Sequence, residues 1–252
     1  MKEVIVEKKE GYLLVTLNRP HVRNAINFEV MDLLEESIEQ VKTDGNCKAM
    51  VITGTGNVFC SGGDLKVFHL LDNQKDAYQM LSRMGEILYK IATLPKPVFA
   101  FLNGPAVGGG LELATACDFR YVKKGSLMGF IQIQQGITTG WGGGALLLER
   151  VAESKGLEWL MSGRKFSEEE ACLYGFANGV VSEIDEKTIV GIIEPIIKND
   201  IDALKAYKSM TIRKRKASDL HKRMQEEIKR CSELWVLPFH METVERFQKK
   251  SQ

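Results

Sequence analysis

The chain has 252 residues, 44% of them apolar, which is enough for one large domain with a substantial core. Its formal net charge of +1 excludes a global attraction to nucleic acid or to an anionic membrane. Five scattered cysteines without a CxxC pair, and four histidines outside metal-ligand spacing, indicate a reducing compartment and no metal site. We expect a cytoplasmic protein, because the sequence lacks a signal-peptide core and any apolar run of roughly 18 residues.

The first expected element is a β-hairpin. Apolar and charged residues alternate at Val4–Lys8 and Tyr12–Leu17, and Gly11 lies in the turn between them. From Asn27, a good N-cap, apolar residues then recur at helical spacing until Gly45. This spacing predicts one amphipathic helix after the hairpin.

A strand, a glycine-rich turn and a helix recur through the middle of the chain. The segments KAMVITG and KPVFAFLNG are short apolar strands that lead into glycine turns, and IQQGITTGWGGGALLLERV repeats the turn and the helix. This pattern favours an α/β architecture with its turns gathered on one side. Ser167 and Glu170 have the spacing of a capping box at a further helix. Beyond Thr188 the pattern is helical, so we expect a core at 1–190 and a helical subdomain at 191–252.

Two glycine turns are candidates for an oxyanion hole. Gly62 and Gly63 in VFCSGGDLKVF, and the run at 108–110, each follow a strand and precede a helical segment. The first N–H groups of a helix are unpaired, so two converging entrances would stabilise an oxygen that becomes negative. Neither GxxxxGK[ST] nor GxGxxG in a βαβ unit is present, which argues against a phosphate cradle. From the residues alone, the glycines could also serve only tight turns.

Four motifs, in this order, resemble the enoyl-CoA hydratase/isomerase (crotonase) family along nearly the whole chain: VFCSGGDLK, NGPAVGGGLELATACDFR, GITTGWGGGALLLERV and MSGRKFSEEEACLYGFANGVV. The resemblance implies a crotonase-like spiral of ββα units with a C-terminal helical trimerisation region, and a homotrimer or dimer of trimers. It also implies an acyl-CoA substrate, with coenzyme A carried in the thioester and no separate cofactor. By motif position, the two N–H groups that bind the thioester oxygen belong to Gly63 and Gly109, with Gly62 beside them.

Glu112 matches one of two glutamates that position water and move protons in hydratases of this family. The position that matches the second glutamate is Gln132, and no Asp or Glu occurs between Asp118 and Glu149. An amide cannot act as a general base at neutral pH, although it can orient a substrate. We therefore expect Glu112 to be the catalytic acid or base and Gln132 to line the acyl pocket. The alternative for Glu112 is stabilisation of its helix by the helix dipole alone.

Loss of CO2 from a malonyl-type thioester forms the same enolate without proton abstraction. GIxxxWGG with Trp141, TACDFR, and a tail with Trp235, Pro238 and Glu242 resemble the ethylmalonyl-CoA decarboxylase branch. The resemblance favours decarboxylation of a short alkylmalonyl-CoA, with Trp141 keeping the acyl pocket dry or, alternatively, packing between helices. Enoyl-CoA hydration, Δ3-Δ2 isomerisation, and a non-catalytic scaffold that binds acyl-CoA or RNA are the other hypotheses.

Three further side chains near the turn at Gly62 and Gly63 are candidates for a role in the site. Cys60 has no histidine partner in sight, so we interpret it as a buried structural residue rather than a nucleophile. Lys66 follows the turn where the family often places a cation near coenzyme A, and a solvated lysine is the alternative. His69 is interpreted as a surface or packing residue.

The basic run IRKRKASDLHKR, at 212–223, could bind coenzyme A phosphates or nucleic acid. Acidic residues lie close to it in the sequence at Asp219, Glu226 and Glu227. This mixture is typical of a solvated helix face, so we expect no nucleic-acid partner and no membrane partner.

Overall fold

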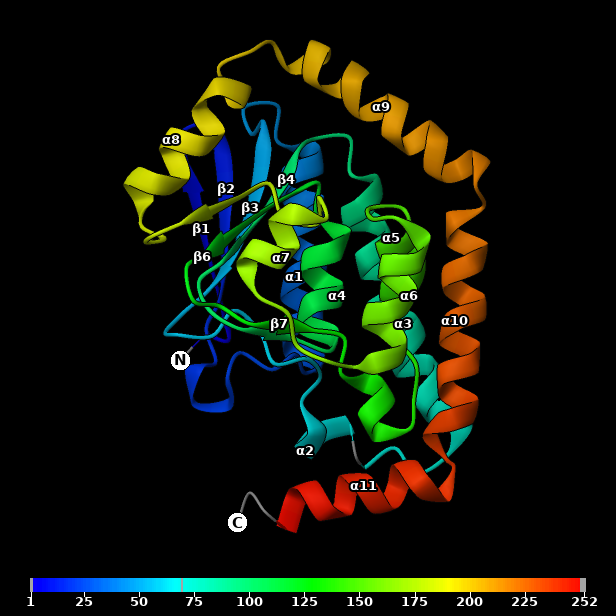
Figure 1. Ribbon diagram of the computed structural model, residues 1–252. Coiled ribbons are helices and arrows are strands. Elements are labelled where there is room, and N and C mark those ends of the chain that lie inside the picture. The colour runs from blue at the N-terminus through cyan, green and yellow to red at the C-terminus, as the bar shows by residue number, and fades with distance from the viewer. Residues whose placement is uncertain (1, 69, 250–252) are drawn as a thin grey trace.

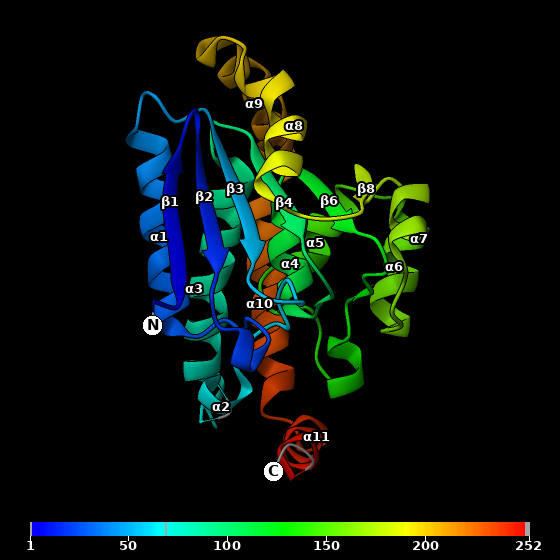
Figure 2. The same cartoon turned by 90° about the vertical axis from the view of Figure 1, so that its left-hand side faces the viewer.

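The computed structural model describes residues 2–68 and 70–249, which leaves His69 outside the described residues. A six-stranded sheet runs in the order β1-β2-β3-β4-β6-β8. Its strands are β1 (Val4–Lys9), β2 (Tyr12–Leu17), β3 (Ala49–Gly54), β4 (Val98–Leu102), β6 (Phe119–Lys123) and β8 (Gly179–Val181). β1 and β2 pair antiparallel and the other neighbours pair parallel (Figure 2). β5 (Ala106–Val107) and β7 (Met128–Gly129) form a second, two-stranded parallel sheet.

Helices lie on both faces of the large sheet. In chain order they are α1 (Phe28–Thr43), α2 (Leu65–Phe68), α3 (Gln74–Thr93), α4 (Gly109–Ala116), α5 (Gly143–Leu148), α6 (Glu153–Ser162), α7 (Glu168–Leu173), α8 (Glu186–Ile197), α9 (Ile201–Ala217), α10 (Leu220–Trp235) and α11 (Pro238–Lys249). Short 3-10 turns occur at η1 (Pro20–Val22) and η2 (Gln132–Gln135). None of the helices described has the apolar length needed to span a lipid bilayer.

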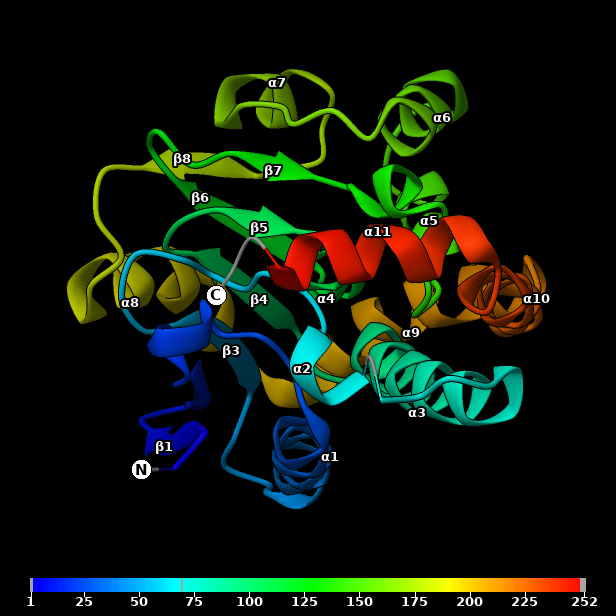
Figure 3. The ribbon, with the colours of Figure 1, turned by 90° about the horizontal axis from the view of Figure 1, so that it is seen from below.

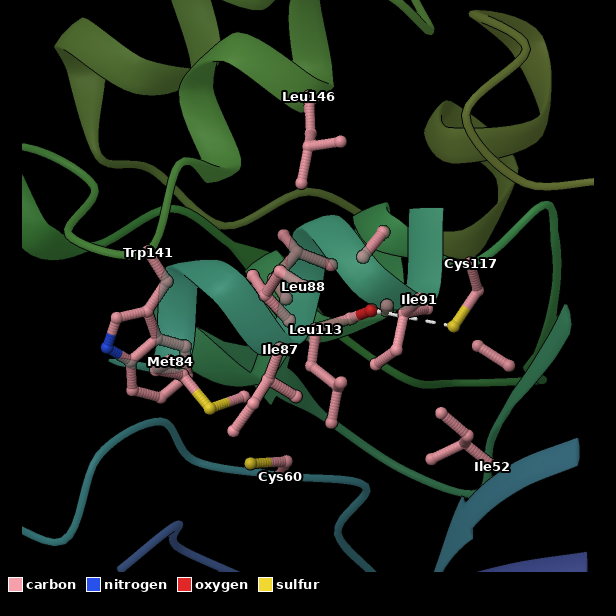
Figure 4. Close-up of a cluster of buried hydrophobic side chains, with 14 of the residues drawn as sticks. Ile52, Cys60, Met84, Ile87, Leu88, Ile91, Leu113, Cys117, Trp141 and Leu146 are labelled. Carbon is pink, nitrogen blue, oxygen red and sulfur yellow. Dashed lines mark hydrogen bonds between the residues drawn. The ribbon is translucent and has the colours of Figure 1, made fainter. Parts of the chain in front are cut away.

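The main core lies between the sheet and the helices α1, α3 and α4. Figure 4 shows Met84, Leu88 and Ile91 of α3 gathered beside Leu113 of α4, with Trp141 at one edge of the cluster. All of these side chains are buried. On the opposite face of the sheet, Ile189 and Ile193 of α8 pack on a smaller cluster of strand residues: Tyr12, Ala49, Val51, Phe99 and Phe101. The sheet is therefore covered on both sides, as its largely parallel strands require.

The local predictions for the first half of the chain are confirmed. The hairpin forms, with Val4 opposite Leu17 and Lys9 opposite Tyr12. Asn27 caps α1, since its side chain accepts a hydrogen bond from the N–H of Val30. The recurring strand, glycine turn and helix are also present, although the short strand β5 intervenes before α4.

The capping box at α7 is only half formed. Ser167 accepts from the N–H of Glu170 at 3.3 Å. The Glu170 carboxylate does not return to Ser167, because it accepts from Trp159 Nε1 at 3.0 Å and from Arg164 Nη1 at 2.9 Å. An ion pair with Arg164, in the loop after α6, and a hydrogen bond from Trp159 of α6 therefore replace the second half of the box.

The helical C-terminal region expected from the sequence is present as α8–α11 (Figure 1). α9 is fastened to the core, because Lys208 and Arg215 form ion pairs with Asp118 at the start of β6. The proposed division into 1–190 and 191–252 stays a prediction, and its boundary lies within α8. Trimerisation and a cytoplasmic location also stay predictions.

Most basic residues of the run at 212–223 are exposed, as expected for a solvated face, but two arginines differ. Arg215 is buried against Asp118, and Arg223 pairs with Glu149. Lys214 also approaches Glu149, at 3.8 Å. Arg215 and Arg223 attach the C-terminal helices to the core, so these two residues of the run have a structural role.

Candidate active site

The loop at 60–64 is held in place by the loop that precedes α1. Ile26 N–H donates to Gly62 O and Asp64 N–H donates to Ile26 O, both at 2.8 Å. Gly62 has a φ of +104°, which favours glycine. The two hydrogen bonds with Ile26 involve the residues on either side of the Gly63 N–H, which points away from Ile26. In the described part of the chain, no protein acceptor takes the Gly63 N–H.

The glycine run at 108–110 has a separate reason at each position. Gly108 has a φ of +55° and precedes α4. A Cβ on Gly109 would overlap the Trp141 ring, and a Cβ on Gly110 would overlap the backbone of Cys60. The run therefore admits an indole and a neighbouring loop. Close packing is thus a second reason for the glycines, beside the opening for a thioester oxygen that the family resemblance implies.

The two predicted oxyanion donors lie in adjoining loops. A Cβ built on Gly62 would be 3.2 Å from the amide nitrogen of Gly109. Gly109 is the first residue of α4, and among the described residues its N–H, like that of Gly63, donates to no protein group. Two free N–H groups in neighbouring segments are suited to stabilise a developing negative charge on oxygen, so the oxyanion hole stays a prediction that this arrangement favours.

Glu112 is buried in the first turn of α4, with 1% of its surface exposed. Its Oε1 accepts from Gln132 Nε2 at 2.7 Å and from Gly140 N–H at 3.3 Å. Its Oε2 accepts from the N–H groups of Trp141 and Gly143, at 2.9 and 2.8 Å. Gln132 is thus brought to Glu112 as an amide partner, in the place where a second carboxylate was missing.

Burial is the largest influence on Glu112 and raises the pKa of its carboxyl group. The four N–H donors act in the opposite direction, because they stabilise the ionised form. A buried carboxyl with a raised pKa beside two free amides has the properties of a catalytic acid or base. A surface glutamate that only complements a helix dipole would not be buried in this way.

Sequence reasoning missed Glu227, which we had assigned to a solvated face. Its carboxylate reaches in from α10 and accepts from Gly144 N–H at 3.0 Å and Ala145 N–H at 2.7 Å. These amides follow Gly143, which donates to Glu112. The one available signal was the run of glycines at 142–144, since a Cβ on Gly144 would lie 3.1 Å from Glu227 Oε2.

A cavity of about 750 Å³ opens beside these groups and is large enough for a small-molecule site. Gly62, Gly63, Gly109, Glu112, Gln132 and Trp141 all line it, so the predicted site residues are brought together. Lys66 also lines it, with an exposed side chain. Figure 3 shows α11 crossing this end of the molecule near α2.

The wall nearest the two free amides is apolar. Phe68 approaches Gly63, and the Trp141 ring covers Gly109. Trp141 is 4% exposed, so it both lines the cavity and packs in the core. Cys60 is fully enclosed, and burial raises the pKa of its thiol to about 12, which fits the structural role expected for it.

Only part of the tail motif reaches the cavity. Trp235 lines it and donates from Nε1 to Leu71 O at 3.1 Å. Pro238 begins α11. Glu242 does not line the cavity. It is exposed, and its Oε2 lies 3.8 Å from Arg246 Nη2 on the same helix.

Comparison with known proteins shows the family and the fold of the chain. The family model described as enoyl-CoA hydratase/isomerase matches residues 7–250. The chain belongs to the enoyl-CoA hydratase/isomerase family. A crystal structure of an enoyl-CoA hydratase/isomerase from Mycobacterium paratuberculosis matches with a TM-score of 0.90 at 23% identity, over 98% of both chains. This likeness confirms the predicted crotonase-like fold.

Two relatives carry different names. Ethylmalonyl-CoA decarboxylase of Gallus gallus is 33% identical over 180 residues, which are 71% of this chain and 60% of that relative. The Bacillus subtilis protein YngF, named provisionally as an enoyl-CoA hydratase/isomerase, is 34% identical over 181 residues, 71% of this chain and 68% of YngF. The chain therefore spans about 60% of the length of the chicken relative it matches. The resemblance to the decarboxylase branch is confirmed at the level of sequence.

Proposed function

We propose that this crotonase-family chain is a lyase that decarboxylates a short alkylmalonyl-CoA, such as ethylmalonyl-CoA. The observation that carries the proposal is the pairing of Glu112 with Gln132. Hydration by two glutamates requires a second carboxylate at that place, and an amide cannot take a proton at neutral pH. Decarboxylation requires a single acid, which Glu112 supplies. Similarity to relatives named ethylmalonyl-CoA decarboxylase supports the same choice.

In the proposed reaction, the thioester oxygen accepts hydrogen bonds from the N–H groups of Gly63 and Gly109. The bond between the α-carbon and the carboxylate breaks, CO2 leaves, and the electron pair enters the enolate. The two amides stabilise the enolate oxygen, which carries more charge than the thioester oxygen did. Glu112 then transfers a proton to the α-carbon and gives butyryl-CoA when the substrate is ethylmalonyl-CoA.

The charge distribution of the cavity supports this direction of reaction. Four basic residues line it, and all have exposed side chains: His21, Arg23, Lys66 and Lys165. At the exposed rim they are suited to the phosphates of coenzyme A. The inner wall at Phe68 and Trp141 is apolar, so a substrate carboxylate held there loses hydration without gaining a cation. Conversion of that carboxylate to neutral CO2 relieves this cost.

Isomerisation of a Δ3-enoyl-CoA is the second candidate, because it also needs one group that moves a proton. The two reactions are separated by incubating the purified chain with ethylmalonyl-CoA, methylmalonyl-CoA, a 3-enoyl-CoA and crotonyl-CoA in parallel. Mass analysis is expected to show loss of CO2 from a malonyl thioester, and chromatography distinguishes the 2-enoyl from the 3-enoyl thioester, which have the same mass. Conversion of only the 3-enoyl thioester to its 2-enoyl isomer, or of only crotonyl-CoA to its hydrate, would reject the decarboxylase assignment.

Gln132→Glu is expected to convert the amide partner of Glu112 into a like charge. The 2.7 Å hydrogen bond from Gln132 is lost, and decarboxylation should fall about tenfold or more while hydration of crotonyl-CoA becomes detectable. Gln134→Glu is the matched control, because Gln134 is exposed in the same short helix. Equal decarboxylation by both variants would remove Gln132 from the account.

Trp141→Ala is expected to admit water next to the oxyanion donors. The variant should decarboxylate about tenfold more slowly or worse and should gain hydration of crotonyl-CoA. Loss of this buried side chain also lowers the free energy of unfolding by about 3–5 kcal/mol, so thermal unfolding must be measured alongside. An unchanged decarboxylation rate without any hydration would show that the indole does not keep the site dry.

A further inference from the structure

Glu112 and Glu227 are held by the same turn of the backbone. The N–H groups of residues 140, 141 and 143 donate to Glu112, and those of the next two residues donate to Glu227. The segment 140–145 therefore connects a carboxylate of α4 with a carboxylate of α10. Any displacement of Glu227 is transmitted to the backbone that holds Glu112.

No cation compensates this pair. In the described part of the chain, neither carboxylate has a lysine, arginine or histidine among the main influences on its titration. Besides the two carboxylates themselves, the titratable group that faces the pair is the buried thiol of Cys231 on α10. The short helix η2 and the segment 139–148 contribute amides and the Thr139 hydroxyl.

Glu112 is buried and Glu227 is half-buried, and two such neighbouring carboxylates without a cation are costly to ionise together. The pKa of Glu227 is raised to about 7. Burial is the largest cause, and the negative charge of Glu112 acts in the same direction. Burial also raises the pKa of Glu112. Because both carboxylates are held by one backbone segment and their pKa values move in the same direction, we expect them to titrate as a coupled pair.

We propose that Glu227 is the positioning residue of this site, acting through Glu112 by holding the segment 140–145 and by placing a second negative charge that makes the pair retain a proton. Glu227 does not line the cavity, so it does not touch substrate. The retained proton is the one that Glu112 transfers to the α-carbon, after which the pair takes up another from solvent. This inference rests on the role of Glu112 in the proposed function.

The pH dependence of turnover tests this role. In Glu227→Gln the second charge is absent, so Glu112 loses its proton at lower pH than in the wild-type chain. The limb of the kcat profile that reports Glu112 should move to lower pH by about one unit or more, with KM unchanged. The direction is the same whether Glu112 acts as acid or base. A purely structural role would instead lower kcat equally at every pH.

Glu226→Gln is the matched control, because Glu226 is exposed on the same helix and lies 3.9 Å from Lys222. Its profile should coincide with that of the wild-type chain. A Glu227→Gln profile at the wild-type position would overturn the proposal. The comparison uses whichever thioester the chain turns over, so failure of the decarboxylase assignment is a separate outcome.

Infrared spectroscopy of the wild-type chain tests for the retained proton without substrate. The wild-type chain should show the carbonyl band of a protonated carboxylic acid at neutral pH, and this band should disappear on raising the pH. In Glu227→Gln the band should disappear at lower pH. A wild-type chain without such a band at neutral pH would contradict the shared proton.

Discussion

Glu112→Gln is expected to lower kcat by about 10²–10⁴-fold, because the variant retains the shape of the side chain and loses its proton. KM should change little, since the two oxyanion amides and the cavity rim are untouched. The measurement is the steady-state rate with the thioester that the wild-type chain converts. A variant that retained wild-type kcat would exclude Glu112 from the reaction.

The control for this substitution is Glu29→Gln. Glu29 also lies in the first turn of a helix, α1, but is exposed. Loss of its charge should cost about 0.3–1 kcal/mol of stability through the helix dipole and should leave kcat unchanged. The raised pKa of Glu112 gives a further check. Ionisation of this buried group weakens the folded wild-type chain as pH rises, so the stability of Glu112→Gln relative to wild type should increase with pH.

Gly109→Ala is expected to lower kcat by about 10²–10³-fold. The added methyl group would overlap the Trp141 ring, so either the indole or the first turn of α4 must move. Movement of that turn misdirects the N–H of residue 109 away from the enolate oxygen. The rate is measured at saturating substrate, with thermal unfolding as a check on the fold.

Two further variants test whether this loss of rate comes from the steric overlap between the added methyl group and the Trp141 ring. Gly45→Ala should be silent, because a Cβ at Gly45 has nothing within 4 Å. Adding Trp141→Phe to Gly109→Ala should restore part of the rate, since a smaller ring leaves space for the methyl group. If the double variant is slower than the product of the two single effects, the steric explanation is wrong.

The parts of the site that could be predicted from sequence are those encoded by local pattern. The turns at Gly62 and Gly108 follow strands and precede helices, so their backbones were expected to present free amides. Glu112 is fixed relative to this entrance by the helix that begins at Gly109. Four ordered motifs then identified the family and placed Gln132 at the position of its second glutamate, whereas the hydrogen bond from Gln132 to Glu112 came from the structure.

The parts that could not be predicted depend on contacts between distant segments. Glu227 follows a basic run and has the pattern of a surface acid, and only the packing of α10 against α5 brings its carboxylate to the N–H groups of Gly144 and Ala145. The capping box at Ser167 failed for a similar reason, since Arg164 and Trp159 take the Glu170 carboxylate. A local pattern specifies which groups are available, whereas tertiary packing selects their partners.

The most direct test of the proposed function is incubation of the purified wild-type chain with ethylmalonyl-CoA in deuterated water, followed by mass analysis of the thioester. The account predicts butyryl-CoA that has lost CO2 and carries one deuterium on the α-carbon, with crotonyl-CoA unchanged in a parallel incubation. Unchanged ethylmalonyl-CoA together with hydrated crotonyl-CoA would contradict it.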